Sequence, residues 1–190
     1  MPAAPVRPLA PLVAQQVIVV PTHALHEVDA LGWTAQIPRS RELLPELDGE
    51  IEAELAARGI AKQWVFPPAL ERASRLNPSY AVDPYALAAD QLKNPAMIAG
   101  SRIADPLTTQ LRTMVALQES ARAVLMPVEL RFEKLPSGDG VAVLHVAMVD
   151  GRLGEIRWIG DVRSDPSPTF SARTLVTSVA AHLADLIAAP

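Results

Sequence analysis

The sequence has no cysteine among its 190 residues. This absence excludes disulfide bonds, thiolate nucleophiles, cysteine-ligated zinc and iron–sulfur clusters. It does not select a compartment, because a cytosolic protein and an envelope protein that uses no disulfides can both lack cysteine.

Basic charge and long apolar runs are also scarce. The chain has 17 Lys and Arg against 21 Asp and Glu, and this balance provides neither a broad nucleic-acid surface nor a polybasic membrane footprint. No apolar run approaches the roughly 18 residues that a membrane helix needs. The opening stretch, MPAAPVRPLAPLVAQQ, has no apolar segment after a basic one. It is therefore not an intact signal peptide, although it is compatible with what remains after one is removed.

Motifs for phosphate binding and for nucleophilic catalysis are missing from the sequence. It contains no G-x-x-x-x-G-K-[ST] and no G-x-S-x-G, and the stretch after the first predicted strand, PTHAL, has no glycine. We find no pair of carboxylates whose spacing demands acid–base catalysis. The sequence therefore predicts no cofactor and no catalytic residue.

The chain is rich in proline: its 18 prolines mark several boundaries between predicted elements. The proline density of residues 1–15 predicts an extended N-terminal arm, since proline is tolerated neither inside a helix nor in a central strand. The prolines that we propose as contacts for a partner are Pro5, Pro8 and Pro11. Residues 16–190 predict a single α/β domain, with long loops at 21–39 and 67–105.

Apolar periodicity predicts the elements of this domain. The expected strands cover 17–20, 63–66, 124–133, 141–149 and 155–162. The expected helices cover 40–58, 107–117 and 170–187, with small helical pieces in 69–105. The order is β-α-β-(small helices)-α-β-β-β-α, which predicts an α/β (α+β) fold with a mixed sheet of about five strands and helices packed on the sheet.

The sequence also predicts both ends of the first helix. Ser40 is the expected N-cap and Gly59 the residue that stops the helix. Alternation in the strand 124–133 predicts one buried and one solvent-exposed face, and Pro127 predicts either an edge strand or a bulge there, because it has no N–H to donate.

The only metal-like cluster is HALHEVD, with His23 and His26 close to Glu27 and Asp29. Zinc proteases carry two histidines four apart on a helix with the glutamate between them, whereas here the histidines are three apart and the glutamate follows both. We favour a polar loop that happens to contain two histidines, and keep them as candidate metal ligands.

Trp33 is the tryptophan with the best chance of meeting a partner, because it lies in a predicted loop and aromatic residues are enriched in interface hot spots. Trp64 and Trp158 fall in predicted strands, so we expect both to pack in the core.

The stretch DGRLGEIRW, residues 150–158, raises the question of a phosphate loop. Strands flank it on both sides, whereas a phosphate loop opens a helix, so we predict a hairpin turn. Asp150 would bond the turn backbone and Gly154 would adopt a positive φ. The expected register pairs Val149 with Ile156 and Ala147 with Trp158.

The C-terminal half resembles a known group of domains. The features that carry the resemblance are LQESARAVLMPV at 117–128, the strand 141–149, the run with Asp150, Gly154, Glu155 and Trp158, and a closing helix. The group is the domain shared by the N-terminal region of TolB, the curli-secretion channel lipoprotein and the outer-membrane lipoproteins that activate penicillin-binding proteins. The likeness covers residues 16–20, 40–66 and 106–188.

This resemblance implies a non-enzymatic domain of the bacterial cell envelope that binds other proteins. The implied place is the periplasm or the outer side of a membrane, with the cytoplasm left open. The implied role is an accessory or assembly subunit of a larger membrane-associated complex, of the secretion, cell-wall synthesis or electron-transfer type. It implies no nucleic-acid partner and no transmembrane segment of its own, and is compatible with peripheral membrane association.

Two other functions stay open. The first is a small-molecule-binding domain with a pocket beneath loops 21–39 and 67–105. The second is a metal-dependent hydrolase that uses His23 and His26 with Glu27 or Asp29.

Overall fold

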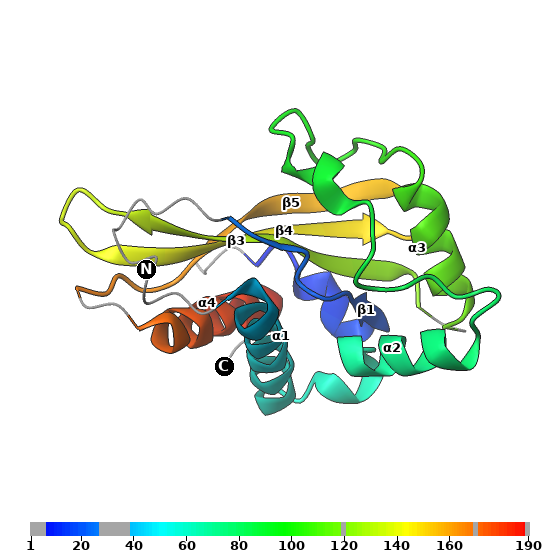
Figure 1. The fold of residues 1–190 in the computed structure, drawn as a ribbon, viewed down its shortest axis with the longest axis horizontal. Coiled ribbons are helices and arrows are strands. Elements are labelled where there is room, and N and C mark those ends of the chain that lie inside the picture. The colour runs from blue at the N-terminus through cyan, green and yellow to red at the C-terminus, as the bar shows by residue number, and fades with distance from the viewer. Residues whose placement is uncertain (1–6, 27–38, 119–120, 169–170, 189–190) are drawn as a thin grey trace.

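In the computed structural model, a five-stranded mixed sheet lies between two layers of helices (Figure 1). The structure describes residues 7–26, 39–118, 121–168 and 171–188. The predicted α/β class, with helices packed on a mixed sheet, is confirmed. No helix in the described segments is both long and apolar enough to cross a membrane.

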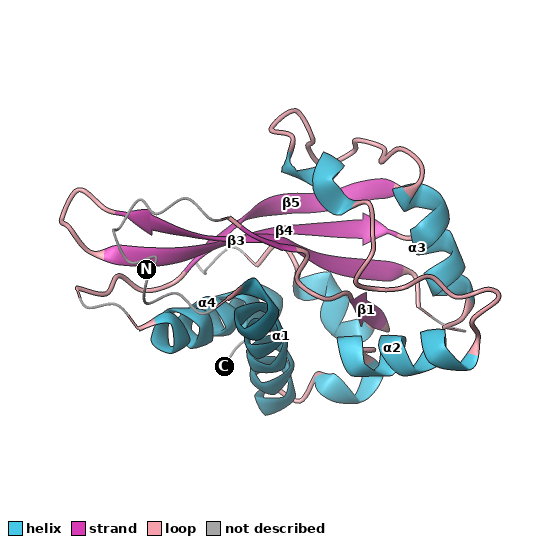
Figure 2. Cartoon of the chain, in the orientation of Figure 1, coloured by secondary structure: helices cyan, strands magenta, loops and turns pink. Residues whose placement is uncertain are grey.

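The sheet is built around one long antiparallel meander (Figure 2). Its strands are β3 (Ala123–Lys134), β4 (Gly140–Asp150) and β5 (Glu155–Arg163). Two short strands, β1 (Val17–Val19) and β2 (Ala24–Leu25), both pair with β3 in parallel. The order across the sheet is therefore β1-β3-β4-β5, with β2 also on β3.

One helical layer consists of α1 (Ser40–Ala57) and α4 (Ala172–Ile187), which lie together below the sheet in Figure 1. Apolar residues every three or four positions give α1 its buried stripe, which ends in a Schellman turn: Gly59, with φ of +77°, donates to Ala56 O, and Ile60 donates to Leu55 O. Gly59 thus stops the helix as predicted. Ser40 is not the N-cap, because the helix already begins there and Arg39 occupies the capping position.

The other layer contains α2 (Pro67–Leu76), the 3-10 helix Ala89–Lys93 and α3 (Leu107–Ala116). The predicted helix 107–117 is present as α3, and its large apolar side chains are buried: Leu107, Leu111, Met114 and Val115. The small helical pieces predicted within 69–105 are present as α2 and Ala89–Lys93.

Side chains of β3 alternate between the two cores until the strand reaches a bulge. Val124 and Met126 pack against the α3 layer, whereas Leu130 and Phe132 pack against the α1–α4 layer. The pairing with β4 shifts register between Pro127 and Glu129, and this shift moves the later residues to the opposite face. The predicted bulge at Pro127 is thus confirmed. The predicted alternation holds only beyond the bulge, where Glu129, Arg131 and Glu133 are half-buried, whereas both faces are buried before it.

Two expected segments differ from the prediction. Residues 63–66 do not form a strand, because the 3-10 helix Ala61–Gln63 precedes and α2 follows at once; only Val65 bridges to Ile18 in parallel. Residues 10–14 do not continue an extended arm but form a 3-10 helix that buries Leu12, with Leu9 buried just before it. Proline suits the first turn of such a helix, since its φ is already set.

Candidate functional site

A cavity lined by described residues lies where the parallel ladder on β3 is interrupted. Val19 pairs with Leu125 and Ala24 with Glu129, so four residues, 20–23, face three residues of β3, 126–128. Pro21 and Pro127 have no N–H to donate, so the regular ladder stops here, although the N–H of His23 still donates to Pro127 O at 3.0 Å. The cavity that opens has a volume of about 370 Å³.

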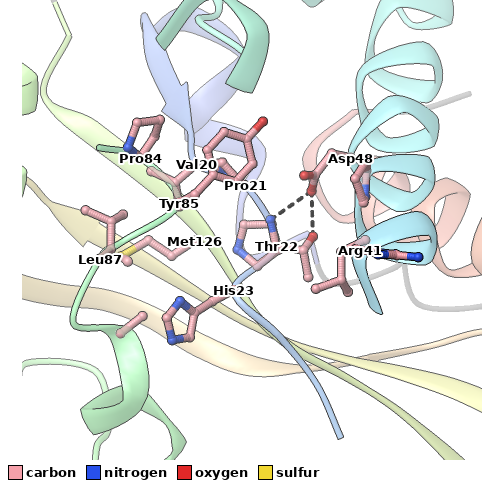
Figure 3. Close-up of a pocket in the computed structure, with 14 residues that line it drawn as sticks. Val20, Pro21, Thr22, His23, Arg41, Asp48, Pro84, Tyr85, Leu87 and Met126 are labelled. Carbon is pink, nitrogen blue, oxygen red and sulfur yellow. Dashed lines mark hydrogen bonds between the residues drawn. The ribbon is translucent and has the colours of Figure 1, made fainter. Parts of the chain in front are cut away.

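Four segments that are distant in the sequence form its walls (Figure 3). They are the residues after β1, the first turns of α1, the segment 84–89 and the bulge of β3. Most of the lining is apolar: Val20, Pro21, Leu44, Pro45, Pro84, Leu87, Ala89, Met126 and Pro127. The polar side chains on the lining come from Thr22, His23, Arg41, Asp48 and Tyr85.

Asp48, on α1, is the carboxylate in this apolar wall. Thr22 is 5% exposed and donates to its Oδ1 twice, from the backbone N–H at 2.8 Å and from the hydroxyl at 2.6 Å. Burial raises the pKa of Asp48 to about 6, and the two hydrogen bonds from Thr22, which favour the charged form, only partly oppose this effect. Asp48 therefore titrates near neutral pH.

The raised pKa makes a prediction for stability. Because the folded protein holds the Asp48 proton more tightly than the unfolded chain, ionisation of this group destabilises the fold as pH rises from about 4 to about 6. We expect Asp48→Asn, which keeps an acceptor for Thr22, to raise the free energy of unfolding by on the order of 2 kcal/mol above pH 7. Urea unfolding at several pH values measures the effect.

Below about pH 4 the gain from Asp48→Asn should vanish, because wild-type Asp48 is then neutral in both states. Glu52→Gln is the matched control, since Glu52 lies one turn further along α1 and does not line the cavity. A gain of equal size at pH 4 and pH 8, or an equal gain from the control, would contradict the burial of a charge at Asp48.

The two histidines predicted as candidate metal ligands do not converge on one point. His23 Nε2 lies 3.5 Å from Asp90 Oδ1, whereas His26 Nδ1 lies 3.7 Å from Glu129 Oε1. Lys93 Nζ contacts both carboxylates, at 2.9 Å and 3.4 Å. Across the described positions, no group of three or more His, Asp or Glu side chains is arranged to hold a metal ion. Glu27 and Asp29 lie outside these positions.

The predicted partner contacts are only partly described. Trp33 and Pro5 lie outside the described residues. Pro8 and Pro11 are exposed, and Pro11 lies in the first turn of the 3-10 helix Ala10–Ala14. These two prolines therefore present their rings to solvent from a segment that Leu9 and Leu12 anchor in the core.

The hairpin turn joins β4 to β5 and packs against α3. Asp150 Oδ1 accepts hydrogen bonds from the N–H groups of Arg152 and Leu153, at 3.1 Å and 3.0 Å. Gly154 has a φ of +65°, and the side chain of Glu155 pairs with Arg157 at 2.9 Å.

The register of this hairpin differs from the predicted one in its second pair. Val149 faces Ile156, as expected, but Trp158 faces Met148 rather than Ala147. A register shift between Val149 and Met148 puts an extra residue on β5 and moves each later pair by one. Trp158 is partly buried and packs against the α1–α4 core, with its ring lying over Gly160.

A second, more open hollow of about 570 Å³ lies between residues 93–99 and the strands β3, β4 and β5. His145 connects the two sides: its Nδ1 is 2.7 Å from Asp161 Oδ1, and its Nε2 is 3.1 Å from the carbonyl oxygen of Leu92. Arg131 also pairs with Asp161, at 2.5 Å. The two ion pairs of Asp161 link β5 to β3 and β4, and the contact of His145 with Leu92 O ties the segment 89–99 to the sheet.

Sequence reasoning missed Asp48 and Thr22. One signal was available: Asp48 stands four residues after Leu44 and three before Ile51, so it interrupts an apolar stripe of α1 with an acid. Thr22 gave no signal, because its role depends on a contact across 26 positions of the chain.

Comparison with known proteins gives similarity to solved structures only. No family model matches the sequence, and no curated protein matches it. The PelC dodecamer from Paraburkholderia phytofirmans is 16% identical, with a TM-score of 0.45 over 94% of this chain and 91% of that chain. Lipoprotein GNA1162 from Neisseria meningitidis is 20% identical, with a TM-score of 0.39 over 90% of this chain and 99% of that chain. The similarity in both cases is one of backbone arrangement.

Proposed function

We propose that this chain is a non-enzymatic interaction domain of the bacterial cell envelope, in the periplasm or on the outer side of a membrane. Its role would be that of an accessory or assembly subunit in a larger membrane-associated complex. The sequence resemblance to envelope domains supports this proposal. Residues 16–20, 40–66 and 106–188, which carry the resemblance, contribute most of the sheet together with α1, α3 and α4.

The observation that carries the proposal is where the exposed apolar side chains lie. Seven large apolar side chains are strongly exposed among the described residues, and four of them fall between 76 and 98. Leu76 and Tyr80, at the end of α2 and in the turn after it, are 74% and 78% exposed. Exposed apolar and aromatic side chains favour contact with a protein partner. The segment 67–105, which the resemblance does not cover, is therefore the proposed docking surface.

A photo-crosslinking amino acid at position 80, in the full-length protein of the native host, tests this surface. We expect a discrete adduct with a protein of the envelope fraction, because an interface seated on Tyr80 holds the partner within reach. Ser137 is the matched control position: it is exposed and lies in the β3–β4 turn, at the other end of the sheet (Figure 1).

The same experiment has a second arm, Leu76→Asp, which should abolish the adduct at position 80 without changing the unfolding midpoint, since Leu76 is exposed. Adducts confined to cytosolic proteins would contradict an envelope role. Equal adducts at positions 80 and 137 would contradict a specific surface. Light scattering distinguishes a partner protein from a second copy of this chain.

A second candidate function, small-molecule binding, is favoured by the cavity around Asp48. Ligand sites are concave and mostly apolar, with a few polar groups that fix orientation. The cavity has this composition, and it lies beside the residues 20–23 and 84–89 of the two long loops. The two functions are compatible, because Leu76 and Tyr80 do not line the cavity, although residues 84–89 belong both to the cavity wall and to the segment 67–105.

A further inference from the structure

One carboxylate oxygen of Asp48, Oδ2, accepts no hydrogen bond from the described residues and is available to a ligand in the cavity. Asp48 Oδ1 accepts both hydrogen bonds from Thr22. Among the described residues, its Oδ2 has no hydrogen-bond donor and no ion-pair partner, although the carboxylate lines the cavity. A carboxylate held in an apolar wall without a counter-ion destabilises the fold when it ionises, which is typical of a group kept for binding.

The basic side chains that line the cavity lie closer to other acids. Arg41, which lines the opening, lies 3.8 Å from Glu42, and His23 lies 3.5 Å from Asp90. Neither forms an ion pair with Asp48. Among the described side chains that line the cavity, none forms an ion pair that compensates the negative charge of Asp48.

Several acids also add negative charge around Tyr85 on one side of the cavity. Tyr85, which is 51% exposed, lies at the opening of the cavity. Burial raises the pKa of its hydroxyl, and the negative charges of Glu71, Asp48 and Asp83 raise it further, against the opposing charge of Arg75. A positively charged ligand would find a favourable field at this opening and an aromatic ring beside it.

We propose that this cavity binds a small organic cation, with an apolar body against the walls and a protonated amine that donates to Asp48 Oδ2. An ammonium–carboxylate hydrogen bond is roughly twice as strong as a neutral one, and it replaces the counter-ion that the carboxylate lacks. The volume of about 370 Å³ is at the small end for ligand pockets, which are about 300–1,000 Å³. This inference rests on the second candidate function and names its ligand class.

The test compares 4-phenylbutylamine with the uncharged 4-phenylbutanol as ligands of the full chain. The protein has five methionines, of which Met126 lines the cavity, so carbon-13 labelling of the methionine methyl groups reports binding there by NMR. We expect the amine to shift the Met126 signal selectively and to bind about tenfold more tightly than the alcohol near pH 7.5. Asp48→Asn should remove this preference, and Glu52→Gln should preserve it.

Lowering the pH to about 5 should weaken amine binding by about tenfold in the wild-type protein, because Asp48 becomes neutral. The alcohol, and the amine with Asp48→Asn, should show no such change. If alcohol and amine bind equally well at Met126, the proposed preference for a cation is wrong, but the cavity remains a binding site. Binding of neither, or uniform shifts of all methionines, would overturn the second candidate function as well; the crosslinking result at position 80 is independent of both.

Discussion

Replacement of Asp150 by alanine is expected to lower the free energy of unfolding by about 3 kcal/mol. Asp150 is 6% exposed and ends β4, where its Oδ1 accepts the N–H groups of Arg152 and Leu153. Its Oδ2 is 2.9 Å from Arg122 Nε and 3.4 Å from Arg157 Nη2. Alanine removes the acceptor for all of these donors. The two partly buried N–H groups then cost about 1–3 kcal/mol each, whereas the exposed Arg122 and Arg157 can turn to water. Urea unfolding at neutral pH measures the loss.

Asp150→Asn is the informative partner variant, because it keeps an acceptor for the turn and removes only the charge. Burial by itself would raise the pKa of Asp150, but the hydrogen bonds from the Leu153 N–H and from Arg122 outweigh it, so the pKa lies below its usual value. The stabilisation from the charge is therefore complete above about pH 4, the unfolded value, and is lost as pH falls through the lower folded value. A deficit of Asp150→Asn that stays constant from pH 7 to pH 2 would contradict this role.

Asp150 and Asp48 illustrate how the same residue type takes opposite roles. Several donors surround the carboxylate of Asp150, whereas among the described residues only Thr22 donates to that of Asp48. Raising the pH from about 4 to about 6 should therefore destabilise the protein through Asp48 and leave the contribution of Asp150 unchanged. Sequence alone predicted the bonding role of Asp150 from its place before a glycine turn.

The sequence predicted the elements that depend on the periodicity of apolar residues and on turn residues within one segment. The meander, the apolar stripe of α3 and the stop at Gly59 depend on periodicity and on a glycine, which are visible in one sequence. Pro127 predicted a bulge, but the face of Leu130 and Phe132 could not be predicted, since it depends on which side of the bulge takes the extra residue. Ala24–Leu25 was missed because two residues are too few to show a period.

The cavity could not be predicted because it belongs to no single segment. Its walls come from four stretches between Val20 and Pro127. It lies where Pro21 and Pro127 interrupt the parallel pairing of the residues after β1 with β3. The sequence hypothesis placed a pocket beneath the two long loops without naming residues. The residue that gives the cavity its charge, Asp48, comes instead from helix α1.

Gly154→Val is expected to lower the free energy of unfolding by about 3–4 kcal/mol, the largest effect that we predict for a single substitution. Gly154 has a φ of +65°, which a β-branched residue adopts only with strain. A Cβ there would also lie 3.0 Å from Thr108 Cγ2 and 3.4 Å from Ile103 Cγ1. The backbone cannot move away easily, because Gly154 N–H donates to Asp150 O and its own oxygen accepts from Ile103 N–H. Chemical denaturation measures the loss.

Three alanine substitutions separate the backbone effect from the packing effect. Gly138 has a φ of +97° with open space around it, so alanine there costs only the backbone strain, about 1 kcal/mol. Gly151 is not in the left-handed region, but its Cβ would lie 2.5 Å from Val115 Cγ2, so alanine there reports the packing against α3. Gly154→Ala should exceed Gly138→Ala, because it combines strain with the Thr108 contact. If the two cost the same, the turn does not pack against α3 as tightly as the structure indicates, and only its backbone conformation requires glycine.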